Sequence, residues 1–188
     1  MGGTTLQDDK KEFFRLLHKN AFFREKITLS SGQESDYYID ARRVTLSATG
    51  VFYAAKIILQ MVREDKFSAI GGPTLGADPL VGALGALSHQ LGRPVNTFII
   101  RKAPKPHGKQ QQIEGPLIPE NSQVILIDDV ATTGKAFVES IEVLKKYNIG
   151  VLKAICLIDR EQGAREALTK YNCPLVSIFK AQEFLDHK

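Results

Sequence analysis

Two adjacent carboxylates stand beside a turn of small residues in the stretch VILIDDVATTGKA, residues 124–136. The four apolar residues before Asp128 and Asp129 predict a buried strand that ends at 127. The turn at 131–135 leads directly into a predicted helix, and backbone N–H groups at a helix start form an anion site. Since an anion would repel the two acids, we expect them to face another group, such as the hydroxyls of a sugar.

The turn differs from the phosphate loops of nucleotide-binding proteins. Two threonines add hydroxyl donors, and the Gly-Lys pair at 134–135 matches the end of a Walker A motif. However, Asp129 stands where that motif requires its first glycine, and Ala136 stands where it requires Ser or Thr. The chain contains no GxGxxG pattern. We therefore expect a phosphate that belongs to neither a nucleoside triphosphate nor a dinucleotide.

A basic segment, RKAPKPHGK at 101–109, carries four cations and a histidine with no acid among them. It overlaps a stretch rich in proline and glycine, 102–121, which predicts a long loop of the kind that forms lids and binding loops. Concentrated positive charge on such a loop indicates a clamp for a polyanion. A solvated basic loop or a nucleic-acid patch is the alternative.

Two further segments are ambiguous on residue types alone. Arg160 follows a predicted strand between Asp159 and Glu161, where a surface ion pair is the ordinary interpretation. The glycine-rich stretch 71–79 also follows a predicted strand, and its glycines allow the backbone to approach a ligand closely. A strand-to-helix turn with Asp78 as the helix N-cap explains that stretch nearly as well.

The chain has 188 residues, 43% of them hydrophobic and 24% charged, as expected for one globular domain at 1–188. Its net charge of +4 fits nucleic acid or a small polyanion, but the chain has no Trp and no aromatic residue within the basic segment, so we expect no nucleic-acid partner. No segment resembles a membrane span or a signal peptide, so we expect a cytoplasmic protein without membrane contact. Cys156 and Cys173 fit a reduced compartment and lack metal-ligand spacing, so no metal site made by the protein alone is predicted.

Alternating strands and helices predict the α/β class, with a central, mainly parallel sheet flanked by helices. The expected helices lie at 6–18, 47–64, 78–92, 134–147 and 162–170, and the expected strands at 67–70, 95–100, 124–127, 151–158 and 176–179. Ligands of such sheets bind beyond the carboxyl ends of the strands, and every motif above lies at or near such an end.

The stretch 124–136 resembles the phosphoribosyl pyrophosphate (PRPP) signature of type I phosphoribosyltransferases. The resemblance implies that the two acids contact the ribose hydroxyls and that the following turn holds the 5′-phosphate. The implied PRPP-binding residues in this stretch are Asp128, Asp129, Val130, Ala131, Thr132, Thr133, Gly134, Lys135 and Ala136.

The pattern Arg-Lys-x-x-Lys-x-His-Gly at 101–108 is similar to the flexible catalytic loop of the orotate phosphoribosyltransferases. In that family the loop closes over the pyrophosphate, usually of the neighbouring subunit, which implies a homodimer that shares the 101–109 loop across its interface. The implied PRPP contacts are Arg101, Lys102, Lys105 and His107. The last three are also the implied catalytic candidates, and the sequence does not choose which of them donates a proton to the departing pyrophosphate.

Three more segments acquire roles from this resemblance. The Ser-Gly-x-x-Ser-x-x-Tyr pattern at 31–38 is similar to part of the family's hood over the pyrimidine, here about 1–45. The Asp-Arg pair at 159–160 matches the family arginine that binds the orotate carboxylate, and an arginine fork suits that planar group. The implied orotate contacts are Thr132, Arg160, Tyr37 and Tyr38, and the implied pyrophosphate loop contains Gly72, Pro73 and Thr74.

The resemblance implies a type I phosphoribosyltransferase fold with a small N-terminal hood and a flexible loop at about 102–121. The implied reaction joins orotate to PRPP and gives orotidine 5′-monophosphate and pyrophosphate, with Mg²⁺ bound mainly through PRPP or pyrophosphate. Some family members carry Lys where Ser30 and Gly76 stand here, and Asp78 adds a negative charge that suits magnesium. A purine or uracil phosphoribosyltransferase is the first alternative, and a PRPP-fold regulator that binds nucleic acid is the second.

Overall fold

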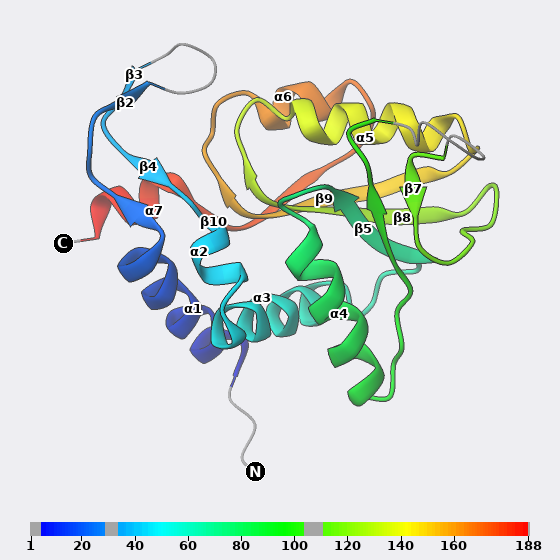
Figure 1. Cartoon of the computed structure of the whole chain (residues 1–188), viewed down its shortest axis with the longest axis horizontal. Coiled ribbons are helices and arrows are strands. Elements are labelled where there is room, and N and C mark those ends of the chain that lie inside the picture. Colours follow the sequence, from blue (N-terminus) through cyan, green and yellow to red (C-terminus); the bar gives the residue numbers. More distant parts are fainter. Residues whose placement is uncertain (1–4, 29–33, 104–110, 188) are drawn as a thin grey trace.

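A six-stranded sheet forms the centre of the protein in a computed structural model that describes residues 5–28, 34–103 and 111–187 (Figure 1). The strands lie in the order β10-β9-β8-β5-β6-β7, and all neighbours are parallel except β6 and β7. Their bounds are β5 (Ala69–Pro73), β6 (Thr97–Ile100), β7 (Ile113–Glu114), β8 (Gln123–Ala131), β9 (Gly150–Asp159) and β10 (Leu175–Lys180). The predicted α/β class with a mainly parallel sheet is confirmed.

Helices cover both faces of this sheet (Figure 1). Their bounds are α1 (Leu6–Asn20), α2 (Arg42–Thr45), α3 (Ala48–Met61), α4 (Asp78–Gln90), α5 (Lys135–Lys145), α6 (Ala164–Thr169) and α7 (Ala181–Asp186). Ile125 and Ile127 of β8 pack into one core with α1, α3 and α4, whereas Val124 and Leu126 pack into a second core with α5 and α6. The continuous apolar run before the acids therefore reflects a strand that is buried on both faces.

A small group of strands lies beside α1 and α7 at one end of the molecule (Figure 1). β1 (Phe22–Phe23) pairs antiparallel with β4 (Tyr38–Ile39), and β2 (Ile27–Thr28) pairs antiparallel with β3 (Glu34–Ser35). Helix α7 was not predicted, and it follows β10 without a loop. The fully buried ring of Phe184 in α7 stacks on Phe14 of α1 at 4.6 Å, so both ends of the chain pack against each other.

Several predicted boundaries were wrong. Strand β5 runs from Ala69 to Pro73, so Gly71 and Gly72 lie within the strand rather than after it. Strand β8 continues to Ala131, so both acids lie within the strand, because β9 is long enough to pair with it as far as Ala131 and Asp159. The predicted loop 102–121 contains β7, which pairs with β6. Asp78 is the first residue of α4 rather than its N-cap, which is Ala77. No side chain caps this helix, and the Asp78 carboxylate instead accepts a hydrogen bond from Thr74 Oγ1 at 2.7 Å. None of the described helices is long and apolar enough to cross a membrane.

Candidate active site

The carboxyl ends of β5, β8 and β9 bring together the glycine-rich stretch, the two acids and Arg160. Strands β8 and β9 end in register, with Ala131 opposite Asp159, and the backbone N–H of Arg160 donates to the carbonyl of Ala131 at 2.8 Å. Parallel neighbours thus place residues from three distant segments at one edge of the sheet, where open α/β sheets bind ligands.

The carboxylates of Asp128 and Asp129 are held by backbone donors. The N–H of Asp129 donates to Asp128 Oδ1 at 2.9 Å, and the N–H of Val130 donates to Asp129 Oδ1 at 2.8 Å. Burial raises the pKa of Asp128 well above its ordinary value, and the charges of Asp129 and then Asp78 raise it further. Burial also raises the pKa of Asp129. A negative charge on this pair is therefore costly until a cation or a set of hydrogen-bond donors arrives.

Gly76 lies directly against the two acids. A Cβ atom at this position would overlap with Asp128 Oδ1 and would lie 2.6 Å from Asp129 Oδ1. No side chain can occupy position 76 while the carboxylates keep these positions. This chain has glycine at 76, and a lysine there would also collide with the two carboxylates as they are arranged here.

Asp78 approaches the same acids from the start of α4. Its Oδ2 accepts from Thr74, whereas its Oδ1 is buried and has no hydrogen-bond partner among the described residues. Its charge contributes to the raised pKa of Asp128. Gly72 and Pro73 lie at the end of β5, just before this loop, and the peptide bond between Thr74 and Leu75 is cis.

The turn between β8 and α5 leaves the start of the helix open. Gly134 is the N-cap of α5 with a φ of 79°, and no side chain caps the helix. Its conformation is left-handed, and a Cβ there would lie 3.0 Å from the Cα of Ala164, so glycine is required on both counts. Thr132 is half-buried, Thr133 is exposed, and the side chain of Lys135 is 80% exposed. Uncapped N–H groups beside hydroxyls and an exposed cation form an arrangement that binds phosphate.

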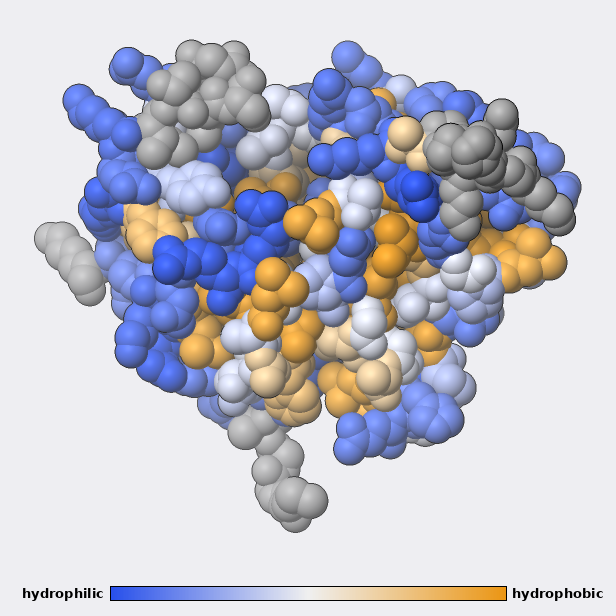
Figure 2. Space-filling view, in the orientation of Figure 1, coloured by the Kyte–Doolittle hydropathy of each residue, from blue (hydrophilic) through white to orange (hydrophobic). Residues whose placement is uncertain are grey.

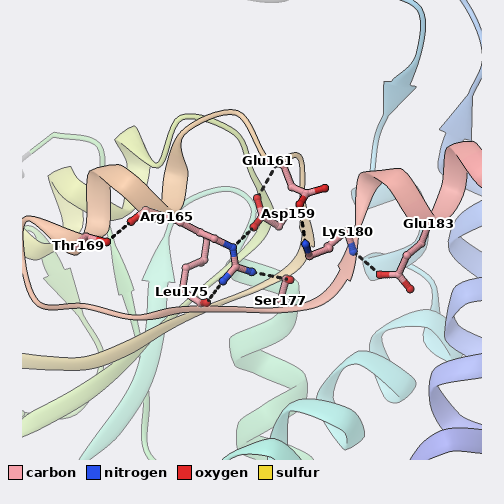
Figure 3. A network of polar contacts seen from close by, with 8 residues as sticks. All are labelled: Asp159, Glu161, Arg165, Thr169, Leu175, Ser177, Lys180 and Glu183. Atoms are coloured by element: carbon pink, nitrogen blue, oxygen red, sulfur yellow. Dashed lines mark hydrogen bonds and ion pairs between the residues drawn. The ribbon is translucent and has the colours of Figure 1, made fainter.

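Arg160 is not the surface ion pair of the ordinary interpretation. Its side chain is buried, its Nη2 donates to Ser35 Oγ at 3.2 Å, and its guanidinium lies 4.6 Å from the ring centre of Tyr37. The neighbouring acids pair elsewhere, Asp159 with Arg165 at 2.9 Å and Glu161 with Lys180 at 2.8 Å (Figure 3). The buried Nε of Arg160 has no hydrogen-bond partner in the described chain, so the guanidinium has capacity for an anion.

The two predicted stacking residues separate in the structure. The ring of Tyr37 packs between Arg160 and Phe22, at a centroid distance of 5.9 Å from the latter. The ring of Tyr38 packs instead on Phe23 at 6.4 Å. Only the first of the two tyrosines is in contact with the arginine.

The basic segment is described only in part. Arg101 pairs with Glu114 at 3.3 Å, and its backbone N–H donates to the carbonyl of Gln112, so it is held against β7. Lys102 is exposed. Lys105 and His107 lie outside the described residues, as does Ser30.

Two polar residues near Arg160 were missed from the sequence. Ser35 belongs to the pattern at 31–38 but received no role, although it donates to the carbonyl of Tyr37 and accepts from Arg160. Arg165 follows Asp159 by six residues, a spacing that carries no helical or strand signal.

Two surface hollows of about 450 and 720 Å³ lie elsewhere, along α1 and α7. Both include His18 and His187, and neither includes any residue named above as a candidate for PRPP or orotate binding. The strand ends are the better candidate, because the buried Asp128 and Arg160 lie there and the raised pKa of Asp128 has the neighbouring charges of Asp129 and Asp78 among its causes.

Replacing Asp128 with asparagine is expected to raise the melting temperature at pH 7 by about 2–4 °C, the shift that about 1 kcal/mol produces in a chain of this size. The folded-state pKa of Asp128 is raised, so the folded protein binds more protons than the unfolded chain, and stability falls as the pH rises above the ordinary aspartate pKa of about 3.9. Asparagine removes that penalty and keeps the Oδ1 acceptor for Asp129.

The measurement is thermal unfolding from pH 7 down to about pH 4, where most of the gain should disappear because Asp128 is then protonated in the folded protein and about half protonated in the unfolded chain. Glu142→Gln is the control, since a hydrogen bond from Lys145 lowers the pKa of that exposed acid, and no gain is expected. A gain that is absent at pH 7, or unchanged at pH 4, would contradict the assignment.

Comparisons with known proteins show the family to which the chain belongs. The model of the phosphoribosyl transferase domain matches residues 50–186. An orotate phosphoribosyltransferase of Aquifex aeolicus is 38% identical over 157 residues, which cover 84% of this chain and 85% of that protein. The crystal structure of the Mycobacterium tuberculosis orotate phosphoribosyltransferase with PRPP has a TM-score of 0.78 at 28% identity and covers 94% of this chain and 98% of that one.

A more distant neighbour shares the fold alone. The adenine phosphoribosyltransferase of Thermoanaerobacter pseudethanolicus has a TM-score of 0.66 at 17% identity and covers 91% of this chain and 99% of that one. The identity to the orotate enzymes is higher and extends over most of both chains. The chain therefore belongs to the phosphoribosyltransferase family and, within it, to the orotate phosphoribosyltransferases.

Proposed function

We propose that this chain transfers the ribose 5-phosphate group of PRPP to orotate, giving orotidine 5′-monophosphate and pyrophosphate in pyrimidine nucleotide synthesis. The observation that carries the proposal is Arg160, a buried guanidinium with an unsatisfied Nε and with both neighbouring acids paired to other cations. Such a group is suited to a planar carboxylate. Orotate has that carboxylate, whereas purines and uracil do not.

In this proposal each half of the PRPP signature binds one half of the sugar phosphate. The turn 131–135 and the uncapped start of α5 hold the 5′-phosphate. Asp128 and Asp129 accept hydrogen bonds from the ribose hydroxyls. As pyrophosphate leaves C1′, positive charge develops on the ribose ring, and the two carboxylates stabilise it. Burial raises the pKa of both acids, so their negative charge is costly in the free protein, and a positively charged ribose ring would offset that cost.

The base is oriented by groups from β9 and the N-terminal strands. Arg160 binds the carboxylate, Thr132 supplies a second contact, and Tyr37, whose ring packs on the guanidinium, contacts the base. Holding the base nitrogen in line with the C1′ bond supplies much of the rate enhancement in such a displacement. We assign the hood to about residues 1–45 of a single domain, and Tyr38 supports it from Phe23 rather than touching the arginine.

The donor set near the pyrophosphate fits a magnesium ion carried mainly by the substrate. Among the described residues no three His, Cys, Asp or Glu side chains are grouped to hold a metal alone. Asp78 nevertheless has a buried Oδ1 that no described residue contacts by a hydrogen bond, while its Oδ2 accepts from Thr74. When bound, Mg²⁺ supplies charge neutralisation for the leaving pyrophosphate. The residues of this chain hold the phosphates with backbone N–H groups, with the cations Arg101, Lys102 and Lys105, and with His107.

We further propose a homodimer that shares the 101–109 loop between its two sites. Figure 2 shows apolar residues gathered across the middle of one face, over α2, α3 and α4. Among the exposed large apolar side chains of the described chain, Leu46 at the end of α2 is 72% exposed and Phe52 of α3 is 46% exposed. A patch of this kind marks an interaction surface. The expected cytoplasmic location stays a prediction.

The proposal is tested by the fall in orotate absorbance after PRPP and Mg²⁺ are added, with uracil, hypoxanthine and adenine assayed in parallel. We expect orotate to be consumed and the three neutral bases to remain unchanged. Turnover of a neutral base, with no turnover of orotate, would favour the purine or uracil alternative. Salt-sensitive binding to RNA or DNA without turnover of any base would favour the regulator.

A further inference from the structure

The acid that precedes Arg160 is fully buried and fully engaged. Asp159 has no exposed surface, its Oδ1 accepts from the backbone N–H of Glu161 at 2.8 Å, and its Oδ2 accepts from Arg165 Nε at 2.9 Å (Figure 3). A buried carboxylate requires a cation or several donors. Arg165 is the only residue with which Asp159 forms an ion pair in the described part of the chain.

Arg165 is itself fixed by further contacts to β10. Its Nη1 donates to the carbonyl of Leu175 at 2.9 Å, and its Nη2 donates to Ser177 Oγ at 3.4 Å (Figure 3). The Arg165 guanidinium therefore links α6 to the end of β9, next to Arg160 in the chain, and to β10. It lies beside the buried acid of the turn and makes no described contact with Arg160.

We propose that Arg165 is a positioning residue for base binding, which neutralises Asp159 so that Arg160 remains available to the acceptor's carboxylate. Without Arg165, the buried charge of Asp159 would be uncompensated, and the cation nearest in sequence is Arg160. Attraction between the two would draw the guanidinium from Tyr37 and Ser35, and it would compete with an incoming carboxylate. The inference rests on the proposed function in assigning orotate to Arg160.

The ion pair between Glu161 and Lys180, in the same network, is expected to affect orotate binding less. Glu161 and Lys180 are 2.8 Å apart, but their side chains are 41% and 52% exposed. Exposed pairs contribute little, because water solvates either charge when its partner is removed. Lys180→Met is therefore the matched control, since it removes a cation from the same network without leaving a buried charge.

The experiment measures orotate and PRPP affinity by calorimetry, together with both KM values, for Arg165→Gln, Asp159→Asn, the double variant and Lys180→Met. In Arg165→Gln we expect orotate affinity to fall by about tenfold, which equals about 1.4 kcal/mol, and PRPP affinity to stay within about twofold. In the double variant, the Asp159→Asn change removes the uncompensated charge, and orotate affinity should return to within about threefold of wild type. Lys180→Met should stay within about twofold.

The difference between the change in orotate affinity and the change in PRPP affinity distinguishes a positioning role from a loss of structure. A smaller folded fraction lowers the active concentration for both substrates alike. Equal losses for orotate and PRPP, or a double variant no better than Arg165→Gln, would overturn the proposal. So would a Lys180→Met loss as large as that of Arg165→Gln.

A second measurement separates this inference from the proposed function. The Nε–H resonance of Arg160, assigned by its absence in Arg160→Lys, should shift in Arg165→Gln and return in the double variant. If the wild-type protein does not use orotate, the proposed function fails, and the resonance alone decides the positioning role. An unchanged resonance in Arg165→Gln would overturn it.

Discussion

Replacing Arg160 with methionine is expected to raise the KM for orotate by about 100-fold and to leave the KM for PRPP within about twofold. Removing one partner of a buried, hydrogen-bonded charge pair costs about 2–5 kcal/mol, and each 1.4 kcal/mol is a factor of ten in affinity. Methionine keeps a long apolar stem in contact with Tyr37, so the change removes the guanidinium rather than the packing. Steady-state kinetics with each substrate varied in turn gives the measurement.

Arg160→Lys is the control that separates the effect of the positive charge from the effect of the planar guanidinium. Lysine keeps the positive charge but lacks the planar fork, so an orotate KM between the wild-type and methionine values is expected. If Arg160→Met weakened both substrates equally, or left the orotate KM unchanged, the assignment of this residue to the base would be wrong.

Replacing Lys105 with alanine is expected to lower kcat by about 100- to 1000-fold, the effect of removing one group that stabilises developing charge. The residue lies outside the described part of the chain, and the prediction rests on the basic segment and its resemblance to a catalytic loop. Because such a loop contributes little to the core, the melting temperature should not change. Lys109→Ala, which removes a cation of the same segment, should alter kcat by only a few-fold. Near-full activity of Lys105→Ala would contradict the clamp.

The same variants test whether the loop is shared between subunits. A mixed dimer of Lys105→Ala and Arg160→Met subunits has one intact site if each loop serves its neighbour. After subunit exchange in equal amounts, about a quarter of the wild-type sites should then be intact. If each loop serves its own subunit, the mixture should stay as inactive as its components.

The sheet could be predicted from the sequence because its strands are buried on both faces. The continuous apolar run before Asp128 is produced by two cores, one on each side of β8. The length of β8 could not be predicted, since Asp128 and Asp129 are polar and only pairing with β9 keeps them in the strand. Helix α7 was missed for a similar reason, because its six residues depend on packing against α1.

The acids and the turn of the candidate site were found because they are contiguous in the chain. The environment of Arg160 was not found, because its partner Ser35 lies 125 positions away and meets it only after the N-terminal strands fold over β9. Local sequence placed Arg160 between two acids and suggested an ion pair with them. In the structure both acids pair with other cations, contributed by α6 and by the end of β10.

The contact between Gly76 and the two acids has a consequence for comparing chains of this family. Since a Cβ at 76 would overlap with Asp128 Oδ1, that position and the orientation of the acid pair cannot vary independently. A relative with lysine at the equivalent position must hold either its loop or its acids in another conformation. In this chain, glycine at 76 therefore lets the loop after β5 approach the acid pair, and a larger residue there would require the carboxylates of Asp128 and Asp129 to turn away.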